Sequence, residues 1–252
     1  MAGQRIAADI KATMRLIDHT LLKQYASTGQ IDALVEEAAR LGVYCVCINP
    51  VFAKHAKELI IRNGHDLKLA VVIDFPFGAS DTENRKAQIK SMKGIADEVD
   101  IVIQQGPVKD GDFDALLDDL KSVSAQAHSD DLLIKVIVED AHLEQDQRVK
   151  VYEAVFNCGA DFINTSTGFG DGLYSKSIGN GVIGATIENV KLMNDISQRL
   201  GKTNVGIKAS GGVRTYSQLV ELLNASGRDA DPRHFRIGAS ASMQIYQEMT
   251  NQ

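Results

Sequence analysis

Lysine and aspartate side chains interrupt several apolar runs of this sequence. Lys135 and Lys208 each follow an isoleucine inside such a run, and Asp100 precedes an Ile-Val-Ile run. A charged residue is tolerated there only if it is paired or functional. Two lysines in one interior would lower each other's pKa, and burial would lower both further. We therefore expect a neutral amine that attacks a carbonyl carbon, with Asp100 transferring protons. The alternative is a structural ion pair among the same groups.

Two glycine-containing segments suggest a site for phosphate. Gly211 and Gly212 follow the run that contains Lys208, and Gly238 and Ser240 precede the last helical segment. Small residues let backbone N–H groups approach an anion, and a helix N-terminus adds its dipole. Either segment alone is typical of a turn or a helix cap. Their occurrence after two late strands favours phosphate binding.

Other kinds of chemistry find little support. The 6 histidines show neither an H-x-H nor an H-E-x-x-H spacing, so we expect no metal, and we expect no cofactor. The 3 cysteines are too few for a disulfide framework, which favours the cytoplasm, and Cys45 and Cys47 are typical of core packing. With 33 acidic against 27 basic residues, the formal charge of -6 argues against a nucleic-acid partner. No apolar run reaches the roughly 18 residues of a membrane span.

The elements that must position these residues follow a regular alternation. We expect strands at 16–20, 44–49, 67–75, 98–104, 132–139, 160–166, 205–210 and 235–240, with helical periodicity between them. Ser80 with Glu83 predicts one helix start, and Thr186 and Gly201 predict the two ends of another. Eight such units predict a (β/α)8 barrel with an N-terminal helix, formed by residues 1–252 as one domain. An open doubly wound sheet is weaker, because no G-x-G-x-x-G follows an early strand. The active site of a barrel lies at the C-terminal strand ends.

Seven stretches of the chain carry the most specific patterns: residues 17–23, 46–50, 97–100, 133–137, 159–168, 206–215 and 236–240. Together they resemble the deoxyribose-phosphate aldolases. The resemblance implies a (β/α)8 barrel and a class I, metal-free aldolase that uses a lysine Schiff base. Such an enzyme interconverts 2-deoxyribose 5-phosphate with glyceraldehyde 3-phosphate and acetaldehyde. We accordingly expect a phosphorylated sugar or aldehyde as the partner and a homo-oligomer.

The resemblance also implies roles for individual residues. Asp100 matches the proton-relay aspartate, Lys208 the lysine that perturbs the pKa of the nucleophile, and Lys135 an additional lysine of the site. We further expect pocket residues at Asp18, Cys47 and Ser166 and, where the chain departs from the family pattern, at Asp74. The expected phosphate-binding residues are Gly168, Gly211, Gly212, Gly238 and Ser240.

Asn164 occupies the position at which the family carries its Schiff-base lysine. A carboxamide cannot form an imine, so the standard mechanism is excluded as it stands. One explanation is an engineered replacement of a single residue. Clustered departures (Asp74, Gln104, Gln105 and a longer segment at 169–184) instead indicate a paralogue. In that paralogue Lys208, or less favourably Lys176, replaces the nucleophile, or the protein is a non-catalytic sugar-phosphate sensor or partner subunit. The segment 169–184 would then be a lid, an interaction surface or a surface excursion.

Overall fold

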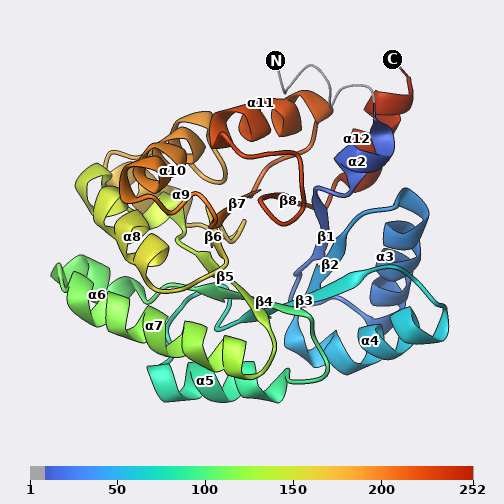
Figure 1. Ribbon diagram of the computed structural model, residues 1–252, viewed down its shortest axis with the longest axis horizontal. Helices are drawn as coiled ribbons and strands as arrows, with labels where there is room; N and C mark the ends of the chain where they lie inside the picture. Colours follow the sequence, from blue (N-terminus) through green and yellow to red (C-terminus); the bar gives the residue numbers. More distant parts are fainter. Residues whose placement is uncertain (1–8, 252) are drawn as a thin grey trace.

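Eight parallel strands close into a barrel in the order of the chain. The computed structural model describes residues 9–251, and β1 pairs with both β2 and β8 (Figure 1). The strands are β1 (Ile17–Leu21), β2 (Cys45–Ile48), β3 (Lys68–Ile73), β4 (Glu98–Val102), β5 (Leu133–Ile137), β6 (Phe162–Asn164), β7 (Gly206–Ser210) and β8 (Phe235–Ala239). The expected barrel is confirmed, and the open sheet is wrong.

Helices surround the barrel and cover the outer faces of its strands (Figure 1). They are α2 (Ile10–Met14), α3 (Thr28–Leu41), η1 (Pro50–Phe52), α4 (Ala53–Arg62), α5 (Thr82–Ser91), α6 (Gln105–Asp110), α7 (Phe113–Ser129), η2 (Asp140–His142), α8 (Gln145–Asn157), α9 (Gly172–Ser177), α10 (Ile187–Leu200), α11 (Tyr216–Ser226) and α12 (Ser242–Thr250). In α3 the periodic positions Ile31, Leu34, Val35 and Ala38 are the buried ones. Burial of such apolar stripes against the strands holds the two layers together. None of the helices in residues 9–251 is long and apolar enough to cross a membrane.

Helix α10 has the ends that the sequence predicted, whereas α5 begins differently. The Thr186 side chain accepts a hydrogen bond from the Asn189 N–H, and Gly201 ends α10 with φ 66°. Helix α5 is capped by Asp81, not by Ser80, because the Asp81 carboxylate accepts a hydrogen bond from the Asn84 N–H at 3.0 Å.

Two strands end earlier than their apolar runs because the chain turns away. Strand β3 stops at Ile73, where Asp74 adopts φ 49°, and β5 stops at Ile137, two residues before Glu139 with φ 50°. Both are non-glycine residues in the left-handed region, which ends the alternation of side chains. Glu139 consequently does not continue the face of Lys135. Its carboxylate accepts hydrogen bonds from the backbone and hydroxyl of Thr167.

The segment 169–184 packs back onto the barrel at both of its ends. A Cβ on Gly170 would lie 3.1 Å from Glu139 Oε1, and a Cβ on Gly184 would lie 2.2 Å from the carbonyl oxygen of Gly211. The Ala185 N–H also donates to that carbonyl at 3.1 Å. The segment, which contains α9, is therefore tied to the loop that follows β7.

Candidate active site

A cavity of about 260 Å³ opens at the C-terminal ends of the strands. Its lining includes ten of the residues singled out from the sequence: Cys47, Asp100, Asn164, Ser166, Gly168, Lys208, Gly211, Gly212, Gly238 and Ser240. They come from five strands (β2, β4, β6, β7 and β8) and the loops that follow them. The fold thus gathers at one point residues that lie far apart in the chain.

Lys208 and Asp100 form the floor of this cavity together with buried groups beneath it. The Lys208 ammonium donates to Asp100 Oδ2 at 2.7 Å and lies 2.6 Å from Asp18 Oδ2. Lys135 donates to the other oxygen of Asp100 at 2.7 Å and lies 2.6 Å from Glu98 Oε2. Asp18 and Lys135 are fully buried and do not line the cavity, so they act on a ligand only through Lys208 and Asp100.

Arg236 and Glu98 complete this network, and the sequence analysis did not single out either one. The Arg236 guanidinium donates to Asp18 at 2.7 Å and to Glu98 at 2.9 Å, and it lies 4.1 Å from the centre of the Tyr44 ring. Three carboxylates thereby face three cationic side chains inside the barrel. The sequence signal that could have found Arg236 and Glu98 was the one that found Lys208, because each of them is a charged residue in an apolar strand segment.

The network raises the pKa of both lysines, contrary to the expected neutral amine. Burial lowers the pKa of Lys208, but the charges of Asp100 and Asp18 outweigh it and hold the pKa above its usual value. The pKa of Lys135 is also raised, because Asp100, Glu98 and Asp18 outweigh its burial. In the same way, burial raises the pKa of Asp18, but Lys208 and Arg236 hold it well below its usual range. The Lys208 side chain is therefore an ammonium at neutral pH.

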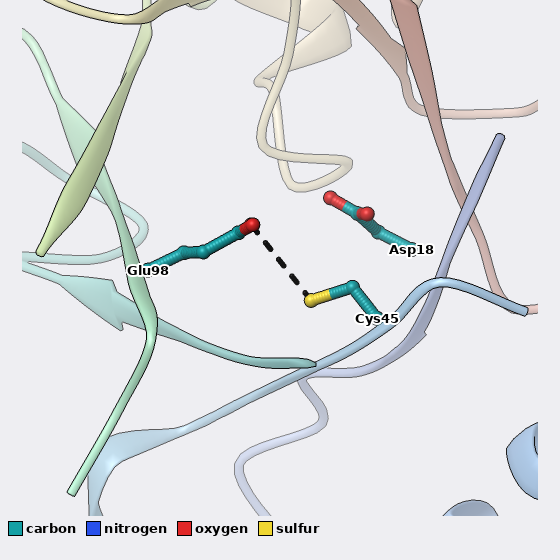
Figure 2. A group of neighbouring side chains, drawn as sticks. All are labelled: Asp18, Cys45 and Glu98. Atoms are coloured by element: carbon teal, nitrogen blue, oxygen red, sulfur yellow. Dashed lines mark hydrogen bonds between the residues drawn. The ribbon is translucent and has the colours of Figure 1, made fainter. Parts of the chain in front are cut away.

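Asp18, Cys45 and Glu98 project toward one another in the barrel (Figure 2), with one ligand atom from each lying within 4.8 Å of the others. The Cys45 thiol lies 3.9 Å from Glu98 Oε2. Burial, followed by the charges of Asp18 and Glu98, raises the pKa of Cys45, so the thiol keeps its proton. Both carboxylates already bind cationic side chains, and a protonated thiol is a poor metal ligand. These residues fit an ion-pair network better than a metal site.

Asn164 lies beside Lys208 in the register of β6 and β7. Its side chain is 2% exposed, and its Oδ1 has no hydrogen-bond partner among the described residues. The hydroxyl oxygens of Ser166 and Ser210, which also line the cavity, are likewise buried and unpaired. Buried polar atoms in proteins are nearly always hydrogen-bonded, so these three mark places where a ligand or water binds.

Besides Asp18 and Lys135, which lie beneath the cavity, two further residues proposed from the sequence lie away from it. Asp74 was expected in the pocket, but its carboxylate accepts hydrogen bonds from Ser80 and lies 3.6 Å from Arg85 Nε. Its left-handed backbone turns the side chain under the start of α5. Lys176, the weaker candidate nucleophile, is exposed on α9 and does not line the cavity.

The mouth of the cavity can bind an anion. Gly211 and Gly212 have φ values of 87° and 83°, and a Cβ on Gly238 would lie 2.4 Å from Ser210 Oγ. Helix α12 begins at Ser242, two residues after Ser240, and has no side-chain hydrogen bond at its N-cap. Two cationic residues that the sequence analysis missed, Lys23 and Arg214, also line the mouth.

Aromatic rings close one side of the mouth. Phe75 and Phe169 pack edge to face with their centroids 5.5 Å apart, and Lys23 Nζ lies 5.5 Å from the centre of the Phe169 ring. The three residues follow β3, β6 and β1. Their meeting depends on loop conformations, and nothing in their sequence context indicated it.

Comparison with known proteins gives a consistent result. A family model described as "DeoC/LacD family aldolase" matches residues 12–248. The chain is 41% identical over 240 residues to a "Deoxyribose-phosphate aldolase" of Thermoplasma volcanium, covering 95% of each chain. It is 39% identical over 236 residues to "Deoxyribose-phosphate aldolase 2" of Staphylococcus aureus, covering 92% of this chain and 94% of the relative.

Two solved structures share the architecture. The structure titled "QR15, an Aldolase" has 28% identity and a TM-score of 0.79, and the match covers 97% of both chains. A deoxyribose phosphate aldolase from Aeropyrum pernix, described as tetrameric, has 24% identity and a TM-score of 0.80, with 99% of this chain and 95% of that chain covered. The second match bears on the fold alone.

Proposed function

Because the chain belongs to the DeoC/LacD aldolase family, we propose that it is a carbon–carbon lyase acting on a short phosphorylated sugar. The reference reaction is cleavage of 2-deoxyribose 5-phosphate to glyceraldehyde 3-phosphate and acetaldehyde. One observation supports this most directly. A single cavity joins the glycine loops after β7 and β8 to the buried Lys208–Asp100 pair. A phosphate bound at those loops would direct the carbonyl end of the sugar toward the floor.

Lys208 is the candidate nucleophile of this proposal. To form an imine, it must first transfer one proton to Asp100 or, through water, to solvent. Its nitrogen then bonds to the carbonyl carbon, and one amine proton passes to the carbonyl oxygen. A second proton, from Asp100 or water, lets this oxygen leave as water and gives the protonated imine. Because two carboxylates stabilise the ammonium, this step should be slower than for an unpaired lysine. Asn164 cannot take part covalently.

Borohydride reduction followed by intact mass and peptide mapping tests the mechanism. The protein is incubated with acetaldehyde, and separately with 2-deoxyribose 5-phosphate, before reduction. An adduct that maps to Lys208 and is lost in Lys208→Met supports the migrated nucleophile. Turnover by Asn164→Lys alone would indicate an aldolase silenced at one residue. Aldehyde release by the native protein without any adduct would refute the imine step.

A non-catalytic sugar-phosphate sensor or partner subunit is the second candidate. It is favoured by the complete ion pairing of Lys208 beside an asparagine that cannot form an imine. Binding of sugar phosphates in the absence of turnover, for both the native protein and Asn164→Lys, would support it.

The remaining expectations extend the same proposal. We propose one barrel domain, Asp18 and Lys135 as residues that hold Lys208 and Asp100 in place, and Cys47 and Ser166 as pocket residues. The phosphate would bind at Gly168, Gly211, Gly212, Gly238 and Ser240. We also propose a cytoplasmic homo-oligomer, in keeping with the relative described as tetrameric. Light scattering would measure the mass in solution.

A further inference from the structure

The two walls of the cavity differ in polarity. Strands β6 and β7 contribute Asn164, Ser166, Lys208 and Ser210, whereas β2 and β3 stand across the barrel from them. On that opposite side the lining consists of apolar side chains and a thiol, including Val72 and Cys47. Burial raises the pKa of Cys47 to about 12, so this thiol is uncharged. The buried polar atoms of the lining that lack a hydrogen-bond partner among the described residues therefore lie on the β6–β7 wall, whereas Asp100 on β4 is already paired with Lys208 and Lys135.

The polar groups of this wall lie at two levels. Asn164 and Lys208 are neighbours in the register and form the lower level, and Ser166 and Ser210 follow each of them by two residues. The Gly211–Gly212 loop comes directly after Ser210. A ligand whose phosphate binds at that loop and whose carbonyl oxygen meets the Lys208 ammonium would lie along this wall. Its carbons next to the carbonyl would then face Asn164.

Asn164 is the residue on this wall whose unmet hydrogen bond is best defined. Its Oδ1 is buried and unpaired, and the neighbouring ammonium already donates to Asp18 and Asp100. The amide oxygen is thus free to accept a hydrogen bond from a ligand. A methylene group at that position would leave the oxygen desolvated and unpaired, which is unfavourable, whereas a hydroxyl would satisfy it.

The geometry points to Asn164 as a specificity-determining residue that accepts a hydrogen bond from a hydroxyl next to the carbonyl carbon. This inference rests on the proposed function, since it concerns the same cavity. It assigns the site to phosphorylated sugars that carry a 2-hydroxyl group, in preference to their 2-deoxy counterparts. The asparagine would then recognise the substrate from the position at which the resemblance to the family predicts the nucleophilic lysine.

Isothermal titration calorimetry with ribose 5-phosphate and 2-deoxyribose 5-phosphate tests this inference. We expect the native protein to bind ribose 5-phosphate about tenfold more tightly, the effect of one hydrogen bond to an otherwise unpaired buried group. Asn164→Leu, which keeps a similar shape without the amide, should bind the two sugars equally. Asn164→Ala should do the same and serves as a second variant if the leucine side chain disturbs the fold, which thermal melting would reveal.

Asn157→Leu is the matched control. Asn157 is exposed at the end of α8, and its amide donates only to the Glu153 carbonyl. This variant should retain the native preference for ribose 5-phosphate.

The failures of the two proposals are distinguishable. Equal binding of both sugars by the native protein, or tighter binding of the 2-deoxy sugar, would overturn the role of Asn164 and leave the proposed function standing. Equal binding would mean that water satisfies the amide. If the native protein binds neither sugar, and neither binds nor cleaves other short phosphorylated sugars and aldehydes, both proposals are overturned.

Discussion

Replacing Asp18 with asparagine would test the charge balance inside the barrel. Asp18 faces Lys208 at 2.6 Å and Arg236 at 2.7 Å, and all three side chains are almost fully buried. The native network pairs three carboxylates with three cations. Asp18→Asn leaves one positive charge in excess among side chains that are at most 3% exposed. Breaking one side of a buried ion pair typically costs about 3–5 kcal/mol of unfolding free energy.

Urea denaturation followed by circular dichroism would measure this cost. A loss of about 3–5 kcal/mol corresponds to a fall in Tm of roughly 6–20 °C for a chain of this size. The sign of the pH dependence is also fixed. The raised pKa of Lys208 stabilises the native protein below the ordinary lysine pKa, and that contribution is lost only as the pH rises through the raised value. In Asp18→Asn the pKa of Lys208 should fall, so the variant should lose the most stability, relative to the native protein, around neutral pH. Below the ordinary aspartate pKa this difference should shrink, because the native protein then loses the stability that the lowered pKa of Asp18 contributes.

Glu153→Gln is the control, because Glu153 pairs with Arg199 on the surface. Exposed ion pairs contribute about 0–1 kcal/mol. The double variant Asp18→Asn, Lys208→Met restores the balance of charge and should recover part of the lost stability. If Asp18→Asn costs no more than Glu153→Gln, the buried network does not contribute as described.

Three further outcomes are expected. Gly238→Ala places a methyl group against the Ser210 hydroxyl, where an added Cβ would lie 2.4 Å away, and should raise the Kd for inorganic phosphate and sugar phosphates in calorimetry without unfolding the barrel; unchanged affinity would remove Gly238 from the anion site. Burial raises the pKa of Asp140 to about 7, so native stability should fall as the pH rises from about 4 to 7, and Asp140→Asn should flatten this slope in urea midpoints measured across that range. A slope that persists in the variant would assign it to another group. Phe169→Ala removes the ring that packs on Phe75. Because Phe169 is 39% exposed, the variant should have a higher KM or Kd for sugar phosphates and a Tm close to that of the native protein. A lower Tm with an unchanged KM or Kd would make the ring a structural element.

Local signals in the sequence determined much of the fold. The β-branched runs located all eight strands, because a strand buried by helices must be apolar along its length. Thr186 and Gly201 marked the ends of α10, since capping depends on groups within a few residues. Ser80 and Asp81 are neighbours, and either could cap the N-terminus of α5. Asp81 does so, because Ser80 donates hydrogen bonds to Asp74 in the preceding turn. The same turn holds Asp74 away from the pocket.

Tertiary structure decided the chemical state of the site. The sequence placed Lys208 and Asp100 inside apolar strands, and it showed an amide at position 164. It did not show that Asp18 lies across the barrel from Asp100 with Lys208 between them, because β1, β4 and β7 meet only when the barrel closes. The charge of a buried lysine depends on the carboxylates within a few ångströms of it, whatever their separation along the chain. For that reason the sequence located the lysine, and only the closed barrel showed it to be an ion-paired ammonium.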